Sequence, residues 1–158
     1  MNKNKRVVVG MSGGVDSSVT ALLLKQQGYD VVGLFMRNWE YGIKGSQCPN
    51  RIEFEDAKKV GALIGIEVIG KDFVKEYRDR VFDVFLDGLK QGLTPNPDIL
   101  CNREIKFNVF LNEAKNMGAD MIATGHYAKI AKYKDHFVLD TPKDSSKDQS
   151  YFLHALSS

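Results

Sequence analysis

A glycine-rich run near the start of the chain has residue types that suit phosphate binding. It reads GMSGGVDSS and covers residues 10–18. Adjacent glycines at positions 13 and 14 let the backbone turn and approach a ligand closely, and they leave amide groups that point at an anion. A helix that starts after them adds the positive end of its dipole. We therefore expect the loop to hold phosphate, the alternative being that its glycines only form a tight turn.

The spacing within this run excludes the two commonest phosphate loops. It has no GxxxxGK lysine to reach a γ-phosphate and no GxGxxG spacing for a dinucleotide. Its serine hydroxyls and bare amides suit a pyrophosphate leaving group, and Asp16 can position a magnesium ion that bridges the phosphates. The run resembles the SGGxDS signature of the PP-loop ATP pyrophosphatases, which implies adenylation of a substrate oxygen and release of pyrophosphate.

A second set of reactive residue types lies in NPDILCN, residues 96–102, within a stretch that two prolines stiffen. Asp98 is placed to cap a helix, which predicts that Cys101 lies in the first turn. The helix dipole would there favour thiolate and lower the pKa of Cys101. The plain alternative is that Asp98 is only an N-cap and Cys101 only a small buried hydrophobic residue.

Longer motifs favour the chemical interpretation because they resemble the signatures of the tRNA 2-thiouridylases. They are TPNPDILCNREIKF (residues 94–107), GLFM followed by NW (33–39), ATGHY (123–127) and KDQSYFL (147–153). They occur in the order expected for that family and cover nearly the whole chain. On this resemblance the chain is identified as a member of the family, within the PP-loop superfamily.

The resemblance implies that ATP and Mg²⁺ bind at the glycine loop, with Asp16 serving the metal through the ATP phosphates. The matching ATP-binding positions are Gly10, Met11, Ser12, Gly13, Gly14, Val15, Asp16 and Ser17. Met36 and Gly125 should contact the adenosine, because ligands of open α/β sheets lie beyond the carboxyl ends of the strands.

The resemblance also implies a tRNA site with several parts. The matching positions are Asn96, Pro97 and Asp98 for the target base, then Lys147, Asp148 and Gln149, and His126. Asp98 is implied to be the acid/base for the uridine, and Cys101 the catalytic nucleophile that attacks a persulfide. For His126, a purely structural histidine is the alternative.

The implied reaction begins when the wobble uridine leaves its stack and enters the pocket. Its 2-oxygen attacks the α-phosphate of ATP, magnesium and the loop amides stabilise the departing pyrophosphate, and sulfur then displaces AMP. The family receives its sulfur from a persulfide donor protein in a cysteine-desulfurase relay. Its second cysteine lies downstream of KDQSYFL, beyond this chain, and Cys48 is no substitute because it lies outside every matched motif.

We therefore expect residues 1–158 to be one truncated PP-loop domain that lacks the family's C-terminal tRNA-binding domains. In isolation it should bind ATP without completing the reaction. Two other functions share the glycine loop. One is an amidating PP-loop synthetase, which adenylates a carboxylate and needs neither NPDILC nor Cys101. The other is an ATP-binding module without turnover.

The elements that position these motifs alternate between strand and helix, which predicts an α/β fold. Strands are expected at 6–9, 31–36, 66–69 and 121–124. Helices are expected to end at Gly28, at Gly65, near Gly92 and at Gly118. This order predicts an open, mostly parallel sheet with helices on both faces, a loop at 37–50 and a small hairpin between 128 and 139.

Composition agrees with a globular cytoplasmic protein. The chain is 43% hydrophobic and 27% charged, and its net charge of +2 means that any RNA site must be a local patch. No apolar run reaches the roughly 18 residues of a membrane span, and the N-terminus resembles no secretory signal. No membrane partner is expected, and the two cysteines should stay reduced.

Overall fold

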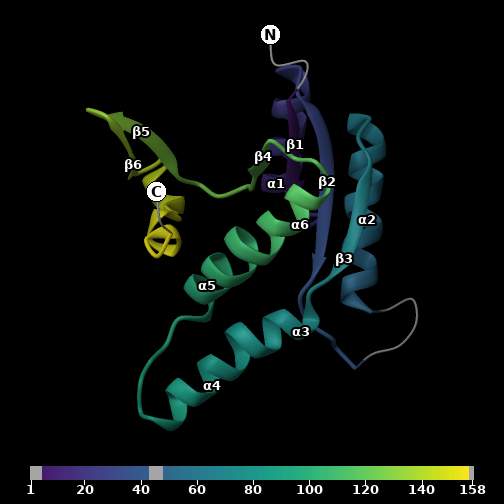
Figure 1. Cartoon of the computed structure of the whole chain (residues 1–158). Coiled ribbons are helices and arrows are strands. Elements are labelled where there is room, and N and C mark those ends of the chain that lie inside the picture. Colours follow the sequence, from purple (N-terminus) through teal and green to yellow (C-terminus); the bar gives the residue numbers. More distant parts are fainter. Residues whose placement is uncertain (1–4, 43–47, 157–158) are drawn as a thin grey trace.

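The computed structural model describes residues 5–42 and 48–156, and its centre is a sheet of four parallel strands (Figure 1). In chain order these are β1 (Arg6–Gly10), β2 (Asp30–Arg37), β3 (Val68–Asp72) and β4 (Met121–Ala123). Their order across the sheet is β3-β2-β1-β4. In the register, Val8 lies opposite Val32 on one side and Ile122 on the other. Strand β1 is therefore buried between two neighbours, which fits its apolar sequence.

Helices cover both faces of this sheet, because successive strand residues point to opposite sides. Val7 and Val9 pack with Ala21 of α1 (Val15–Gln26) and Ala57 of α2 (Pro49–Ile64). Val8 and Leu34 face the other way and pack against a second set of helices. The buried members of that second cluster are Phe73, Val81, Ile105, Phe110 and Ala114.

The second face is covered by two long helical runs, each of which contains a π-helical segment (Figure 1). The first consists of α3 (Val74–Tyr77), η1 (Arg78–Phe82) and α4 (Asp83–Lys90). The second consists of α5 (Pro97–Leu100), η2 (Cys101–Val109) and α6 (Phe110–Asn116). The segments η1 and η2 are π-helical, so residues five apart lie on one face there. Segment η2 carries Cys101, and α6, which follows it, packs against β4.

After β4 the chain forms an antiparallel hairpin that lies apart from the parallel sheet (Figure 1). Its strands are β5 (Lys129–Tyr133) and β6 (His136–Asp140), joined by a tight turn in which Lys134 has a φ of 53°. Two short 3₁₀ helices follow, η3 (Ser145–Lys147) and η4 (Ser150–Leu153). They bring the KDQSYFL motif back beside the segment that follows β4. There Gln149 N–H donates a hydrogen bond to the Tyr127 carbonyl oxygen at 2.9 Å.

The predicted fold class and hairpin are confirmed, while several boundaries differ, most of them by one residue. Helix α2 begins at Pro49, inside the stretch predicted as a loop, because proline suits the first position of a helix. Residues 43–47 of that stretch lie outside the described residues. Strand β3 covers Val68–Asp72 rather than residues 66–69, because it pairs with β2 from Gly33 to Arg37. Within the described ranges, no helix is long and apolar enough to cross a membrane.

Candidate functional site

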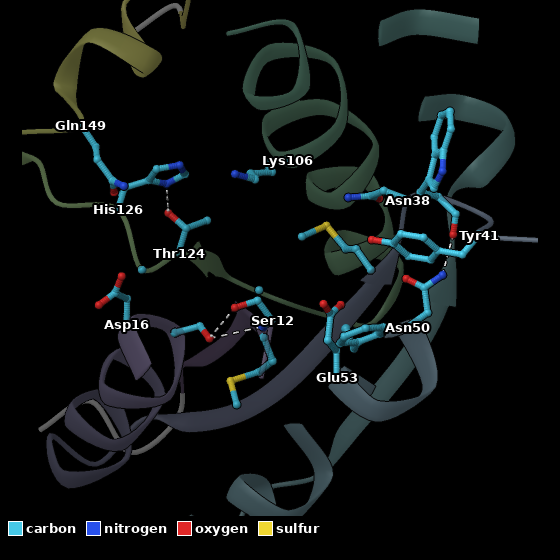
Figure 2. A pocket seen from close by; sticks show the side chains of 17 residues that line it. Ser12, Asp16, Asn38, Tyr41, Asn50, Glu53, Lys106, Thr124, His126 and Gln149 are labelled. Carbon is cyan, nitrogen blue, oxygen red and sulfur yellow. Dashed lines mark hydrogen bonds between the residues drawn. The ribbon is translucent and has the colours of Figure 1, made fainter. Parts of the chain in front are cut away.

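A pocket of about 400 Å³ opens at the carboxyl ends of β1 and β4, and Figure 2 shows it from close by. The chain leaves β1 for β2 on one side and later returns to β4 on the other, so this is the switch point where open α/β sheets bind ligands. The volume lies within the range of small-molecule sites. The predicted site residues that line it are Gly10, Met11, Ser12, Asp16, Ser17, Met36, Gly125, His126 and Gln149.

The glycine loop forms one wall with a backbone that only glycine suits. Gly13 has a φ of 80°, and a Cβ atom there would lie 2.8 Å from the carbonyl oxygen of Glu53. Gly14 precedes α1 and has no side chain to cap it. Ser17 Oγ accepts from Ser12 N–H at 3.2 Å and lies 3.2 Å from the Gly14 carbonyl oxygen, to which it donates. The serines thus hold the loop, and the uncapped start of α1 can receive an anion.

The segment after β4 packs directly on the first turn of α1. A Cβ atom on Gly125 would lie 2.8 Å from both the carbonyl carbon of Asp16 and the backbone nitrogen of Ser17. A side chain at position 125 would therefore force the two walls apart. Gly125 keeps the segment that follows β4 close enough to the glycine loop for one ligand to contact both.

Asp16 forms an ion pair that the sequence motifs do not reveal. Lys147 Nζ lies 2.8 Å from Asp16 Oδ2 and 4.2 Å from the centre of the Tyr127 ring. The hydrogen bond with Asp16 raises the pKa of Lys147. The predicted metal residue and a predicted tRNA residue are thus partners in this structure.

The glycine loop and Asp16 fit a magnesium ion that is bound together with nucleotide phosphates. Across residues 5–42 and 48–156, no group of three or more His, Cys, Asp or Glu residues could hold a metal by itself. Magnesium bound with phosphates needs only one or two protein carboxylates. Asp16 supplies one at the rim of an uncapped helix start, provided that Lys147 gives up its contact.

His126 faces the pocket as a neutral ring. Its Nδ1 lies 2.7 Å from Thr124 Oγ1. Burial, with a smaller contribution from the nearby Lys106 ammonium, lowers the pKa of His126 to about 4. At neutral pH the ring can exchange hydrogen bonds with a ligand but brings no positive charge to RNA phosphates.

The helix that carries Cys101 is capped by Asn96 and not, as the sequence predicted, by Asp98. Asn96 Oδ1 accepts from Asp98 N–H at 2.9 Å and from Ile99 N–H at 3.4 Å. Pro97 takes the first helical position, which it favours. Asp98 therefore lies inside the first turn with its side chain exposed and no capping duty.

The predicted low pKa of Cys101 is also wrong. Cys101 follows the first turn, at the start of η2, and packs against the cluster that contains Phe110. Burial raises the pKa of the thiol; Lys106 opposes this rise and Asp98 adds to it. Desolvation of the thiolate is the largest of these effects.

The remaining predicted positions lie outside the pocket described above. Gly13 and Gly14 line a neighbouring hollow of about 450 Å³ together with Ser12, Glu53 and Asp56. Val15 is 76% exposed and lines neither space. The positions predicted for tRNA and sulfur chemistry that do not line the pocket are Asn96, Pro97, Asp98, Cys101, Lys147 and Asp148.

Several pocket residues were missed by sequence reasoning. They are Phe35, Asn38, Trp39, Tyr41, Asn50, Glu53, Lys106 and Thr124. Thr124 and Lys106 lie inside matched motifs, so the motifs could have indicated them. Glu53 had no such signal, because α2 brings it to the glycine loop from a different part of the chain. Asn38 Oδ1 is buried and, among the residues that the structure describes, has no hydrogen-bond partner.

Comparison with known proteins shows which family this chain resembles. The family described as "tRNA methyl transferase HUP domain" matches residues 5–158. A tRNA-specific 2-thiouridylase, MnmA 2 of Aliarcobacter butzleri, is 95% identical over all 158 residues, which are 43% of that protein. The MnmA of Burkholderia multivorans is 58% identical over 96% of this chain and 40% of its own. The chain thus spans about two fifths of the length of these curated relatives.

Two solved structures share the fold. The U34-tRNA thiolase NcsA of Methanococcus maripaludis, solved with its [4Fe-4S] cluster, matches with a TM-score of 0.53 and 26% identity. The match covers 78% of this chain and 39% of that one. A predicted tRNA methyltransferase subunit of Methanocaldococcus jannaschii has a TM-score of 0.50, with 16% identity, over 84% of this chain and 55% of its own. The second likeness concerns the fold alone.

Proposed function

The chain belongs to the tRNA methyl transferase HUP domain family, and from this membership we propose that it binds ATP to adenylate a uridine of tRNA for 2-thiolation. The observation that carries the proposal is the switch-point pocket, where the uncapped start of α1 faces Thr124, Gly125 and His126. The names of the relatives supply the substrate and the reaction. We propose the full reaction for a protein of the relatives' length, and ATP binding alone for the 158-residue chain.

Different walls of the pocket bind different parts of ATP. The glycine loop and the first amides of α1 hold the β- and γ-phosphates, where a helix start favours negative charge. Met36 and Gly125 contact the adenosine at the ends of β2 and β4. Asp16 would hold a magnesium ion bound with the phosphates, and that ion would supply charge neutralisation to the departing pyrophosphate.

The target base enters from the side of α5. Asn96, Pro97 and Asp98 form the contact for the base, and the exposed carboxylate of Asp98 is free to exchange a proton with it. The correction of the helix cap supports this role, because a capping carboxylate would be occupied by backbone amides. His126, Lys147, Asp148 and Gln149 form the second contact with the tRNA.

Sulfur transfer uses Cys101 and a persulfide fed by a cysteine-desulfurase relay in the cytoplasm. The Cys101 thiolate attacks the inner sulfur of the persulfide, a disulfide forms, and the outer sulfur leaves as hydrosulfide. The hydrosulfide attacks the activated carbon of the base, and AMP leaves with the former 2-oxygen. Since burial raises the pKa of Cys101, its thiolate must form when substrate is in place.

Pyrophosphate release with unmodified tRNA tests the adenylation step. The 158 residues replace the matching stretch of the 95% identical relative, which gives a chain of that relative's length. We expect release from ATP that depends on tRNA and is abolished by Asp16→Asn, with the unfolding midpoint unchanged. Release with a small carboxylate and ammonia would indicate an amidating synthetase instead. Methyl transfer to the tRNA, the activity in the family description, would also contradict the proposal.

Sulfur transfer is tested with Cys101→Ser in the same chimera. The variant should make no 2-thiouridine while still releasing pyrophosphate, because activation of the base needs only the pocket and Asp98. The unmodified 158-residue chain should bind ATP and form no 2-thiouridine. Thiolation by the Cys101→Ser variant would remove Cys101 from the mechanism.

A further inference from the structure

Lys106 is the only lysine or arginine among the described residues that line the nucleotide pocket. It is half-buried, and within residues 5–42 and 48–156 it forms no ion pair. In the part of the chain that the structure describes, two acidic residues line the pocket, of which Asp16 is paired with Lys147 and Glu53 forms no ion pair with Lys106. A partly desolvated ammonium without a counter-ion is unfavourable by itself and favours the binding of an anion.

The π-helical segment η2 explains why Lys106 reaches this position. In a π-helix, backbone hydrogen bonds join residues five apart, so Cys101 and Lys106 lie on one face. In a regular α-helix the same two residues would diverge around the axis. Lys106 lines the pocket together with Thr124, Gly125 and His126, and Cys101 lies on the same helical segment η2. Figure 2 shows its side chain reaching into the pocket across from Ser12 and Asp16.

These positions assign Lys106 to one particular phosphate. The glycine loop takes the β- and γ-phosphates at one wall, and the uridine arrives from the side of Cys101 at the other. The α-phosphate must lie between them, where the uridine oxygen can reach it. We propose that Lys106 binds the α-phosphate of ATP and stabilises the negative charge that gathers there during adenylation.

This inference rests on the proposed function and adds a catalytic residue to it. In the step concerned, a bond forms between the uridine oxygen and the α-phosphorus. The bond to the bridging oxygen breaks, and pyrophosphate leaves with the electron pair. The Lys106 ammonium exchanges no proton; it supplies fixed positive charge where the transition state needs it.

The binding test uses three ligands that report on different parts of the pocket. Lys106→Met should weaken AMP binding to the 158-residue chain by about 10- to 100-fold, as expected for a lost charge-assisted hydrogen bond. Binding of pyrophosphate and of adenosine should be unchanged, and Lys106→Arg should restore most of the AMP affinity. Lys115→Met is the matched control, because Lys115 lies on the same helical run and is exposed.

The kinetic test uses the full-length chimera with ATP and tRNA. Lys106→Met should lower the rate of pyrophosphate release at saturating substrate by a similar factor, with Lys115→Met at the parent rate. AMP affinity equal to the parent's, or equal losses for AMP, adenosine and pyrophosphate, would overturn the assignment. If the parent itself releases no pyrophosphate with tRNA, the proposed function fails, while the AMP result still decides whether Lys106 binds the α-phosphate.

Discussion

Gly13 and Gly28 have the same left-handed backbone in different surroundings. Their φ angles are 80° and 85°, but a Cβ atom on Gly13 would lie 2.8 Å from the Glu53 carbonyl oxygen, whereas one on Gly28 would meet nothing within 4 Å. Substitutions at the two glycines therefore separate two effects on the free energy of unfolding. One is backbone strain, which both share, and the other is the steric clash with Glu53, which occurs only at Gly13.

We expect Gly28→Ala to lower the free energy of unfolding by about 1–2 kcal/mol and to leave ATP affinity unchanged. Gly13→Ala should lower it further and also weaken ATP binding, because the glycine loop must move away from α2. Denaturant unfolding and calorimetry measure the two effects. If both variants lost the same free energy of unfolding and kept the same ATP affinity, the close approach of Gly13 to Glu53 would contribute to neither.

The thiol of Cys101 leads to a prediction opposite to the one that its motif gave. Because burial raises its pKa above the ordinary 9.0, alkylation of Cys101 should be slow at pH 7. In a Cys48→Ser background the rate should keep rising through pH 9. Stopped-flow alkylation against pH measures this. A rate that levels off near neutral pH would restore the activated thiol predicted from the sequence.

At the scale of elements, the start of α5 has one residue that caps the helix, Asn96, and one that does not, Asp98. Asn96→Ala removes the acceptor of two backbone N–H groups and should lower the free energy of unfolding by about 1 kcal/mol, with Asn96→Asp restoring it. Asp98→Ala should change stability by less than about 0.5 kcal/mol. In the chimera it should nevertheless abolish pyrophosphate release with tRNA. A larger loss of stability from Asp98→Ala would assign the cap to Asp98 after all.

The cap shows how far the sequence determines an element. The proline between Asn96 and Asp98 favours the first helical position, and this placement makes the preceding asparagine the cap. The position of the proline therefore decides the cap more strongly than the general preference for aspartate does. The π-helical form of η2 had no comparable signal, because no residue type in 101–109 distinguishes it from an α-helix.

Buried strands were the most predictable elements, because apolar runs such as Val7–Val9 suit only a central position in a sheet. The polar end of β3 was not predictable, since Lys71 and Asp72 are strand residues only through pairing with β2. The glycine loop was likewise predictable as a turn between strand and helix, and its residues Ser12, Asp16 and Ser17 line the pocket. Glu53 was not predictable, because α2 brings it to the glycine loop from a different part of the chain, whereas Lys106 lies inside a matched motif that could have indicated it.

Across the whole molecule, the neutral His126 makes stability depend on pH. Its pKa of about 4 in the folded chain lies below the ordinary 6.5, so the unfolded chain takes up the proton first. The free energy of unfolding should therefore be unaffected by this group above pH 6.5, fall between pH 6.5 and 4, and lose nothing more below pH 4. His126→Asn should flatten that fall relative to the parent. Denaturant unfolding from pH 7.5 to 4 measures the difference, and identical slopes would place the titration elsewhere.

The ion pair between Asp16 and Lys147 joins residues that are 131 positions apart. During synthesis at about 5–20 residues per second, the ribosome therefore exposes the glycine loop on the order of ten seconds before its partner lysine is made. The first strand, helix and second strand can pair in that interval, because their contacts are local. The ion pair at Asp16 can form only after residue 147 has been made, so this side of the pocket is completed after β1 and β2 are able to pair.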